Sequence, residues 1–334
     1  MLTKRENMLE TMKVGGHPDR FVNGYEALGL VMGSPFGMRN PNPKYGELNV
    51  KNAWGVIKSW PEGTPGPFPV HKPDTIVIKD IDDWRSYLKV PQVVYDAAEW
   101  EPFIAKAEAV DRKEQFVTAY FAPGVFEQCH YLLEMQNCLM AFYESPDEMH
   151  DLIDEITQFE LDYAAEVCKY MKPEALFHHD DWGSQRSTFL APDMWREFFK
   201  PAYEKIYGYY KSHGVQLIVH HSDSYAATLV PDMIDVGIDV WQGVMRTNDV
   251  PSLIKQYGEK ITFMGNIDSA TIDFEGWTPE KIHQEVYKAC EECGAHYYIP
   301  CASQGLPIST YPGVQEELTR QIDQASKDMA HLFV

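Results

Sequence analysis

Short apolar runs alternate with longer amphipathic stretches along the chain from residue 115 onward. The runs are rich in β-branched and aromatic residues, as is typical of strands that are buried on both faces. They cover residues 116–121, 175–179, 216–220, 239–242, 261–264 and 296–300. Strand–helix alternation repeated in this way predicts a parallel sheet with right-handed crossovers.

The stretches between these runs carry helix signals. Ser145, Pro146 and Glu148 form the pattern of a capping box with proline at the first helical position, and Thr278 followed by proline repeats the cap-then-proline start. Apolar residues in 192–211 recur at helical spacing, which predicts one amphipathic helix there. Glycines 214, 237, 258 and 294 each stand between a predicted helix and the next strand, where a helix-ending glycine belongs.

Residues 1–110 are less regular, because glycine and proline clusters interrupt them. We expect short helices, a strand at Glu26–Val31 and a hairpin around Thr75–Lys79. Two strands from this part would bring the total to the eight of a (β/α)8 TIM barrel. The predicted fold is therefore an α/β TIM barrel forming one domain over 1–334, with an irregular N-terminal extension (1–110) and a regular core (111–334).

An open doubly wound sheet is the competing fold, but no Gly-x-Gly-x-x-Gly follows any predicted strand, so its dinucleotide-binding form lacks its motif.

The composition of the chain reduces the number of possible partners and locations. The chain has 50 acidic and 29 basic residues and a net charge of −21, which argues against a nucleic-acid partner. No apolar run approaches the ~18 residues of a membrane span. The first residues lack the apolar core of a secretory signal, so we expect a cytoplasmic protein with free cysteines.

Polar side chains that can bind metals follow the predicted strands, and in a parallel barrel the carboxyl ends of the strands form the site. His221, Asp223 and Cys301 are the strongest set, because an imidazole, a carboxylate and a thiolate make a three-ligand zinc site with an open position. His221 and Asp223 are two residues apart on an extended segment and therefore point the same way. His220 is the alternative to His221.

Further candidates lie beside this set. Asp181 or Asp180 is expected to act as a general acid, as a ligand or as a partner that orients His221. An aromatic wall for a planar substrate is predicted from residues near the strand ends, and Asn266 is added as a binding residue. The wall residues are Trp182, Tyr225 and either Tyr120 or Phe121, since neighbours on a strand face opposite sides.

Cys290 and Cys293 are not expected to bind a metal, because they end a helix at the opposite face of the sheet. No zinc-protease motif, Gly-x-Ser-x-Gly elbow, P-loop or kinase motif occurs in the chain. The chemistry must therefore be inferred from the strand ends.

An ordered set of motifs over roughly residues 75–330 resembles the uroporphyrinogen decarboxylase-like superfamily. Within it the chain is most similar to the corrinoid-dependent methyltransferases, especially the methyltransferase I components of O-demethylases. The motifs are Asp180-Asp181-Trp182-Gly183-Ser184-Gln185, Phe198-Phe199-Lys200-Pro201, His213-Gly214-Val215, His221-Ser222-Asp223 and Gly265-Asn266-Ile267-Asp268.

The resemblance implies a zinc held by His-x-Cys plus a distant cysteine. Here His221 (or His220) and Cys301 match, and the middle position holds Asp223, or Ser222 in the other register, where the family has cysteine. A carboxylate in that position makes the metal a better Lewis acid toward oxygen, which suits an ether. We therefore expect an aryl methyl ether as the methyl donor, although another donor stays open.

The methyl acceptor implied by the resemblance is a Co(I) corrinoid. The usual histidine-ligated attachment uses Asp-x-His-x-x-Gly, and none of the 12 histidines has an aspartate two residues before it. A separate corrinoid protein is therefore the expected partner.

Three alternatives remain. The decarboxylases of the superfamily are metal-free and carry an arginine-rich N-terminal motif, whereas Arg5, Arg20, Arg39 and Arg85 are scattered here. A metal-dependent barrel hydrolase would act without corrinoid. A binding protein on the same fold would have no activity to lose.

Overall fold

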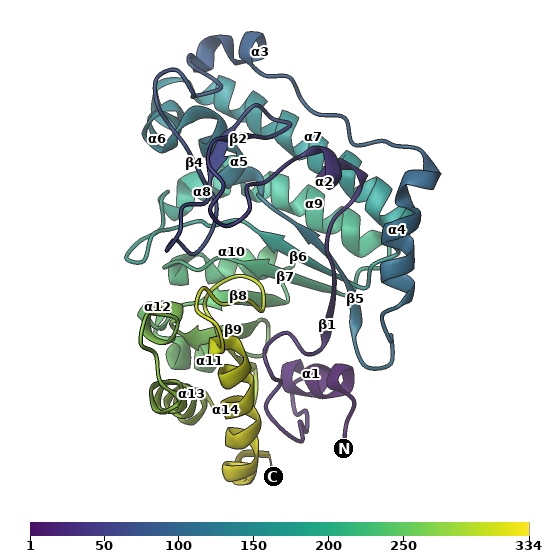
Figure 1. The fold of residues 1–334 in the computed structure, drawn as a ribbon, viewed down its shortest axis with the longest axis vertical. Helices are drawn as coiled ribbons and strands as arrows, with labels where there is room; N and C mark the ends of the chain where they lie inside the picture. Colours follow the sequence, from purple (N-terminus) through teal and green to yellow (C-terminus); the bar gives the residue numbers. More distant parts are fainter. Residues whose placement is uncertain (334) are drawn as a thin grey trace.

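A curled sheet of parallel strands forms the centre of the molecule (Figure 1). The computed structural model describes residues 1–333. Within them the sheet has seven strands, paired in the order β1-β5-β6-β7-β8-β9-β10. Their bounds are β1 Leu28–Val31, β5 Phe116–Phe121, β6 Ala175–His179, β7 Leu217–His221, β8 Val240–Val244, β9 Thr262–Ile267 and β10 Tyr298–Ala302. The predicted TIM-barrel fold is confirmed, with one strand from the N-terminal part rather than two.

Helices connect successive strands and cover the outer face of the sheet, as right-handed crossovers require. The α-helices are α1 Lys4–Met12, α2 Pro35–Arg39, α3 Trp84–Tyr87, α4 Ala97–Glu108, α5 Val125–Leu133, α6 Met135–Glu144, α7 Pro146–Met171, α8 Pro192–Phe198, α9 Lys200–Ser212, α10 Val230–Asp235, α11 Val250–Tyr257, α12 Ser269–Ile272, α13 Pro279–Cys293 and α14 Val314–Asp328. Short 3-10 helices are η1 Ile81–Asp83, η2 Ala227–Leu229, η3 Arg246–Asn248 and η4 Ala330–Phe333. None of the helices in residues 1–333 combines the length and the apolar character that a membrane crossing needs.

Two hydrophobic clusters hold the fold together, one on each face of the sheet. The larger lies between the strands and the outer helices. The smaller fills the barrel interior, where Phe177 of β6, Val219 of β7 and Ile299 of β10 meet. Because strand side chains alternate, the residues next to these point outward into the helical layer. This alternation decides which side chains reach the mouth of the barrel.

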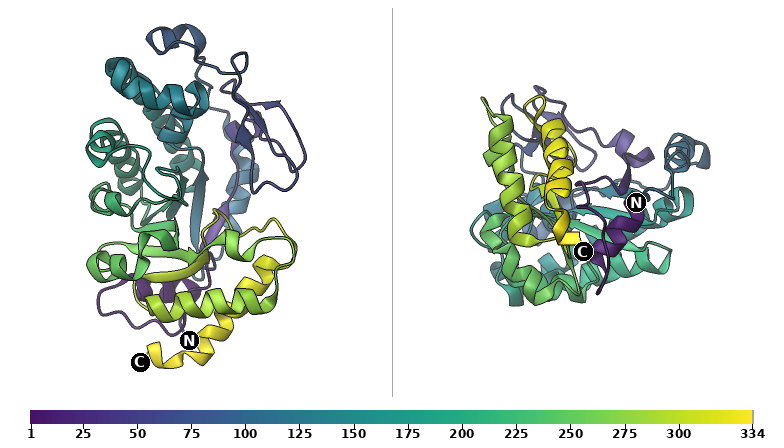
Figure 2. Two further views of the ribbon diagram at one scale, coloured as in Figure 1. Left: turned by 90° about the vertical axis from the view of Figure 1, so that its left-hand side faces the viewer. Right: turned by 90° about the horizontal axis from the view of Figure 1, so that it is seen from below.

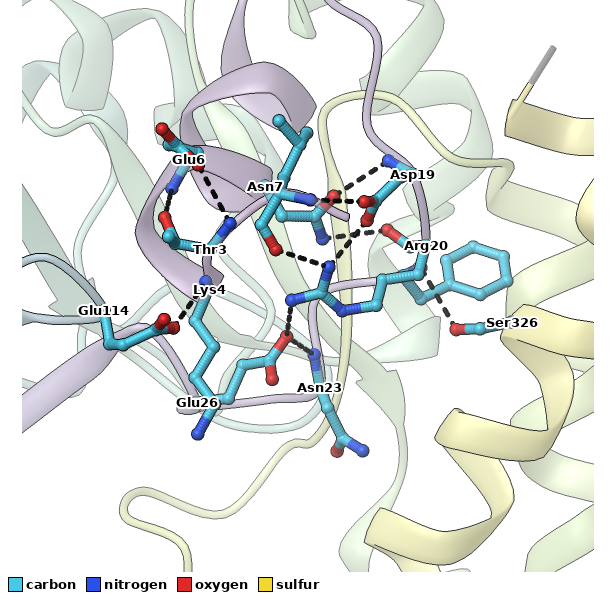
Figure 3. A network of polar contacts seen from close by, with 12 residues as sticks. Thr3, Lys4, Glu6, Asn7, Asp19, Arg20, Asn23, Glu26, Glu114 and Ser326 are labelled. Atoms are coloured by element: carbon cyan, nitrogen blue, oxygen red, sulfur yellow. Dashed lines mark hydrogen bonds and ion pairs between the residues drawn. The ribbon is translucent and has the colours of Figure 1, made fainter.

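Helix α1 closes the floor of the barrel next to the edge strands β1 and β10. It begins with a capping box in which Thr3 Oγ1 accepts from the Glu6 N–H at 3.1 Å and Glu6 accepts from the Thr3 N–H at 2.9 Å. Its buried Asn7 donates to the Arg20 carbonyl at 3.0 Å and accepts from the Asp19 N–H at 3.0 Å (Figure 3). These bonds fix the segment that leads into β1.

The same segment joins the C-terminal part of the chain. The Phe21 N–H donates to the Ser326 hydroxyl on α14 at 3.1 Å. Further along, the Tyr25 hydroxyl accepts from the Leu306 N–H at 2.8 Å. The ring of Tyr25 packs against Phe177 inside the barrel. Residues 19–27 therefore bridge the gap between β10 and β1.

The part of the N-terminal region between β1 and α4, residues 32–96, forms a lobe on one side of the molecule (Figure 2), called the N-terminal lobe below. It contains a small antiparallel sheet with the order β2-β3-β4. These strands are β2 Val50–Lys51, β3 Ile57–Ser59 and β4 Phe68–Pro69. A hairpin was predicted around Thr75–Lys79, but this stretch is not a strand, and the Ile78 N–H bonds to the Leu132 carbonyl of α5 instead.

Two local predictions for helices also need correction. The helix expected over 192–211 is interrupted at Phe199, because Pro201 in the first turn of α9 lacks the N–H that a continuous helix needs. Ser145 is the N-cap of α7, as predicted, but its hydroxyl donates to Asp82 at 2.6 Å and makes no cap bond. Thr278 does cap α13, accepting from the Lys281 N–H at 3.2 Å.

Met8 tests the role of α1 as the barrel floor. Its side chain is 1% exposed and belongs to the interior cluster, so Met8→Ala is expected to lower the free energy of unfolding by about 2–5 kcal/mol. Leu9 on the same helix is 39% exposed, and Leu9→Ala is the control, with an expected change below about 0.5 kcal/mol. Urea denaturation measures both. Equal losses would show that α1 contributes no specific packing to the interior.

Candidate metal centre and active-site cavity

Two histidines face each other at the mouth of the barrel. In the register of β6 and β7, His179 lies directly opposite His221, and their ring centroids are 4.3 Å apart. Both residues follow inward-facing Phe177 and Val219 by two positions, so both point into the barrel. The pairing of two adjacent strands thus brings two imidazoles together.

Asp181 completes the group. It follows His179 by two residues, and its Oδ1 lies 3.8 Å from His221 Nε2. One ligand atom from each of His179, Asp181 and His221 lies within 4.8 Å of the others. The N–H of Asp223 donates to Asp181 Oδ1 at 3.0 Å and holds that carboxylate in place.

Glu127 orients the ring of His179. It stands in the first turn of α5, and its Oε2 accepts from His179 Nδ1–H at 2.8 Å. Its other oxygen, Oε1, accepts from the Tyr131 hydroxyl at 3.1 Å. With Nδ1 occupied in this way, Nε2 is the nitrogen through which His179 would bind a cation after losing its proton.

Gln242 of β8 does the same for His221. Its Nε2 donates to the carbonyls of Ala302 and Gln304, each at 3.3 Å, which fixes the orientation of the amide. Its Oε1 therefore faces His221 and accepts from Nδ1–H. The Nε2 of His221 is thus directed toward Asp181.

Glycine is needed around the ring of His221. A Cβ at Gly243 would lie 3.0 Å from His221 Cε1 and Nδ1, and a Cβ at Gly305 would lie 3.1 Å from Cε1. Gly243 also has φ +90°, which other residues rarely adopt. A larger residue at either position would push the ring of His221 away from its orientation between Gln242 and Asp181.

Burial and neighbouring charges set the protonation of the three side chains. Burial lowers the pKa of His221 to about 3, helped by the positive charge of His179, so His221 is neutral. Burial lowers the pKa of His179 as well, but the negative charge of Glu127 and its hydrogen bond raise this pKa by more, to about 10. Burial raises the pKa of Asp181 to about 6. A metal ion would displace the His179 proton and balance the surrounding carboxylates.

A cavity of about 580 Å³ opens above this group. Its floor consists of strand-end residues that include His179, Asp181, His221 and Asp223. Its roof comes from the N-terminal lobe, with Lys58 and other residues of the β3–β4 region. Its volume is in the range of small-molecule sites.

The donor set suits a catalytic metal ion. Two imidazole nitrogens and one carboxylate oxygen are three protein ligands, which leaves a position for substrate. Zinc uses this combination, and so does non-haem iron(II). Both imidazoles have an outer hydrogen-bond partner, as metal-bound histidines almost always do. The residues present therefore fit a divalent cation.

The structure groups His221 differently from the sequence prediction. His221 stands with His179 and Asp181 rather than with Asp223 and Cys301. Asp223 lines the cavity wall beside them. Cys301 lies lower, in the interior cluster, where burial raises the pKa of its thiol to about 12 against the hydrogen bonds of Gln242 and Tyr25.

His220 points away from the cavity. It lies on the outer face of β7, fully buried, with Nδ1 at 2.9 Å from the Tyr207 hydroxyl of α9. The same hydroxyl lies 2.9 Å from His178 Nδ1, and His178 Nε2 donates to Glu160 at 3.0 Å. This polar network joins the sheet to the helices, so His220 is not placed to replace His221.

Asp180 anchors a helix and does not reach the cavity. Its carboxylate accepts from the N–H groups of Phe126 and Glu127 at 3.0 and 2.8 Å, in the first turn of α5. The indole of Trp182 donates to it at 3.1 Å. A Cβ at Gly124 would lie 2.5 Å from Asp180 Cβ, so glycine permits this close approach. Asp180 thereby positions the helix that carries Glu127.

The other predicted binding residues lie in several places. Tyr120 lines the cavity and stacks on Phe177, and Phe121 borders the cavity but packs on Tyr163 in the outer layer. Trp182 is buried against the outer helices, 4.7 Å from Trp195 between ring centroids. Tyr225 lies in the loop after β7, with its N–H bonded to Ser184.

Asn266 also faces the outer layer rather than the substrate space. Its Nδ2 donates to Cys293 Sγ at 3.2 Å on α13. The six cysteines of the described chain are free and buried, as the sequence indicated.

Three cavity residues were missed by the sequence prediction. His179 carried a usable signal, since His179 and Asp181 are two apart at a strand end, as His221 and Asp223 are. Glu127 follows the loop after β5, where helix starts face the barrel mouth. Lys58 had no signal, because the lobe that carries it has no regular pattern.

The comparisons with known proteins give a family and a fold. The model of the uroporphyrinogen decarboxylase (URO-D) family matches residues 54–324, most of the 334-residue chain. No curated protein matches the sequence. A methyltransferase from Methanosarcina mazei has a similar structure, with a TM-score of 0.66 and 16% sequence identity, over 98% of this chain and 99% of that one.

A second solved structure is more distant. It is a putative fructose-1,6-biphosphate aldolase from Coccidioides immitis, with 12% identity over 72% of this chain and 87% of that one. Its TM-score of 0.29 is too low to carry an argument.

The adjacent residues Asp180 and Asp181 give a matched test of the two roles. In Asp180→Asn an NH2 group replaces one of the two oxygens that accept hydrogen bonds, so it faces buried N–H donors without an acceptor. We expect this variant to have a free energy of unfolding lower by about 2–4 kcal/mol. Asp181→Asn is expected to change it by less than about 1 kcal/mol and to weaken zinc binding by about 10- to 100-fold or more. Thermal unfolding and zinc titration separate the effects. The reverse pattern would contradict the assignment.

Proposed function

Because the chain belongs to the uroporphyrinogen decarboxylase family, we propose that it works as a zinc-dependent methyltransferase of that family. In this proposal it moves a methyl group from an aryl methyl ether to the Co(I) corrinoid of a partner protein. The overall reaction is therefore O-demethylation.

One observation carries the proposal. One ring nitrogen each of His179 and His221 and an oxygen of Asp181 lie within 4.8 Å of one another, beside a cavity large enough for a small aromatic ring. A metal-free decarboxylase has no need of two imidazoles held in this way by Glu127 and Gln242. The Methanosarcina mazei protein of the same fold, which is named a methyltransferase, adds support.

The residues of the chain have separate tasks. His179, Asp181 and His221 hold the metal, while Glu127 and Gln242 fix the two imidazole rings. When bound, zinc supplies a positive charge that draws electron density from the ether oxygen and makes the phenolate a better leaving group. The methyl–oxygen bond breaks with its electron pair on oxygen, the methyl group passes to cobalt, and the oxygen takes a proton from solvent.

The cavity positions the ring and admits the acceptor. Tyr120 offers an aromatic surface on its wall. Met32, Phe68 and Ile308 line the cavity and are 39%, 54% and 46% exposed. Apolar side chains around an opening favour contact with another protein, and a corrinoid protein fits this place.

Variants at the two histidines test the metal and the reaction together. His179→Ala and His221→Ala are each expected to lose bound zinc and to slow methyl transfer by at least about 10³-fold, the scale of the several kcal/mol that a Lewis acid supplies. Elemental analysis measures the metal, including iron. The loss of the Co(I) absorption of a corrinoid, in the presence of a panel of methoxyarenes, measures the transfer.

Two further variants decide the ligand set. Cys301→Ser and Asp223→Asn are expected to retain one zinc per chain, because neither residue belongs to the group of three. Loss of zinc in Cys301→Ser would instead restore the ligand set predicted from the sequence. Transfer by metal-depleted wild-type protein would remove zinc from the reaction, and decarboxylation of a tetrapyrrole without any metal would favour the alternative function.

A further inference from the structure

Lys58 is a buried cation in the roof of the cavity. It lies in the middle of β3 and is 8% exposed. Among the cavity-lining residues of the described chain it is the single lysine or arginine. The protein as a whole carries a net charge of −21, so Lys58 is a local exception that offers a positive charge to a ligand in the cavity.

Lys58 has no acidic partner in the described chain. Its Nζ lies 4.6 Å from the ring centroid of Tyr131, over the face of the ring. The charge of Glu127 acts on Lys58, but the two Glu127 oxygens accept from His179 and Tyr131 rather than from Lys58. The ammonium group therefore keeps hydrogen-bond donors free on the side of the cavity.

A buried ammonium without a partner is costly to desolvate. An anion in the cavity would supply the missing charge and accept the free donors, which is the arrangement that makes charge-assisted hydrogen bonds strong. Lys58 is thus suited to a ligand that carries its own negative charge.

We propose that Lys58 binds a carboxylate on the methyl donor, so that the substrate is an aromatic methyl ether with a carboxylate, of the methoxybenzoate class. This inference rests on the proposed function and narrows its substrate. It assigns Lys58 a role in specificity and none in the transfer of the methyl group.

The charges of the cavity favour a carboxylate over a more highly charged anion. One lysine balances one negative charge, so Lys58 alone matches a carboxylate better than a phosphate dianion. A carboxylate attached to the ring places its charge away from the ether oxygen.

The arrangement also orients the ring. His179, Glu127, Tyr131 and Lys58 follow one another by direct contact, from the metal group to the roof. A ring held by its carboxylate at Lys58 has its opposite side free to point toward the imidazoles. The anchor thus selects which end of the substrate meets the metal.

The test compares the binding of two probes to the zinc-loaded protein, without corrinoid, by isothermal titration calorimetry. The probes are 4-methoxybenzoate and the neutral 4-methoxybenzamide. In the wild-type protein the anion is expected to bind more tightly than the amide. Lys58→Met is expected to weaken the anion by about 10- to 100-fold and the amide by less than about threefold.

Two variants serve as controls. Lys58→Arg is expected to keep the preference for the anion, because it keeps the charge. Lys51→Met removes an exposed lysine from neighbouring β2 and is expected to change neither affinity. Thermal unfolding confirms that each variant is folded. If Lys58→Met unfolds, loss of the preference for the anion in folded Lys58→Arg would still contradict the proposal.

The outcomes are distinct. Equal weakening of both probes in Lys58→Met would overturn the proposal and leave Lys58 with a purely structural role against Tyr131. Absence of a preference in the wild-type protein would overturn it as well. Binding is measured without corrinoid, so the two proposals can fail separately. If the protein prefers the anion but transfers no methyl group, the proposed function is refuted while the role of Lys58 in binding a carboxylate stands.

A pH series gives a second reading. Burial lowers the pKa of Lys58 to about 8, opposed by the charge of Glu127, while His130 and Tyr131 are the other titratable groups of α5 that face it. The affinity for 4-methoxybenzoate is expected to be constant near pH 7 and to fall above pH 8 by up to about tenfold per unit. In Lys58→Arg the affinity is expected to stay level. A fall of equal size in both proteins would count against Lys58.

Discussion

The register between β6 and β7 is the constraint on which the site depends. Each strand ends in two adjacent histidines, and alternation sends one of each pair inward and the other outward. The inner pair, His179 and His221, meets at the cavity, while the outer pair, His178 and His220, is tied to α9 through Tyr207. A slip of one residue would exchange the two pairs. The outer network therefore helps to hold the inner pair in its register.

The sequence was informative about the fold wherever the pattern was strictly periodic. Residues 116–121 and 175–179 were predicted with the bounds that β5 and β6 have, because turns and helix caps delimit them. The strand predicted over 216–220 lies one residue later, at Leu217–His221. The N-terminal lobe could not be derived, because its conformation depends on contacts with distant elements, such as that of Ile78 with Leu132 on α5.

The strand ends could be chosen from the sequence as the place to look for a site, but which side chains meet there could not. Strand ends were expected to supply the chemistry, and Asp181 and His221 are there. Cys301 was selected for its thiol, yet a position two residues from Ile299 faces the barrel interior below the cavity. Asp180 and Trp182 face outward, and Asp180 supports α5, which no residue pattern reveals. To know which side of the sheet a strand-end side chain faces, one needs to know how the strands pair, and this pairing is seen only in the folded chain.

The closure of the barrel by α1 and α14 has a consequence for how the protein is made. The bond between Phe21 and Ser326 joins residues that are 305 positions apart, and the interior cluster needs both Met8 and Ile299. A ribosome delivers these partners at very different times. The nascent chain must therefore keep apolar strand faces uncovered until the final helix emerges, and this is the interval in which chaperones would matter most to its yield.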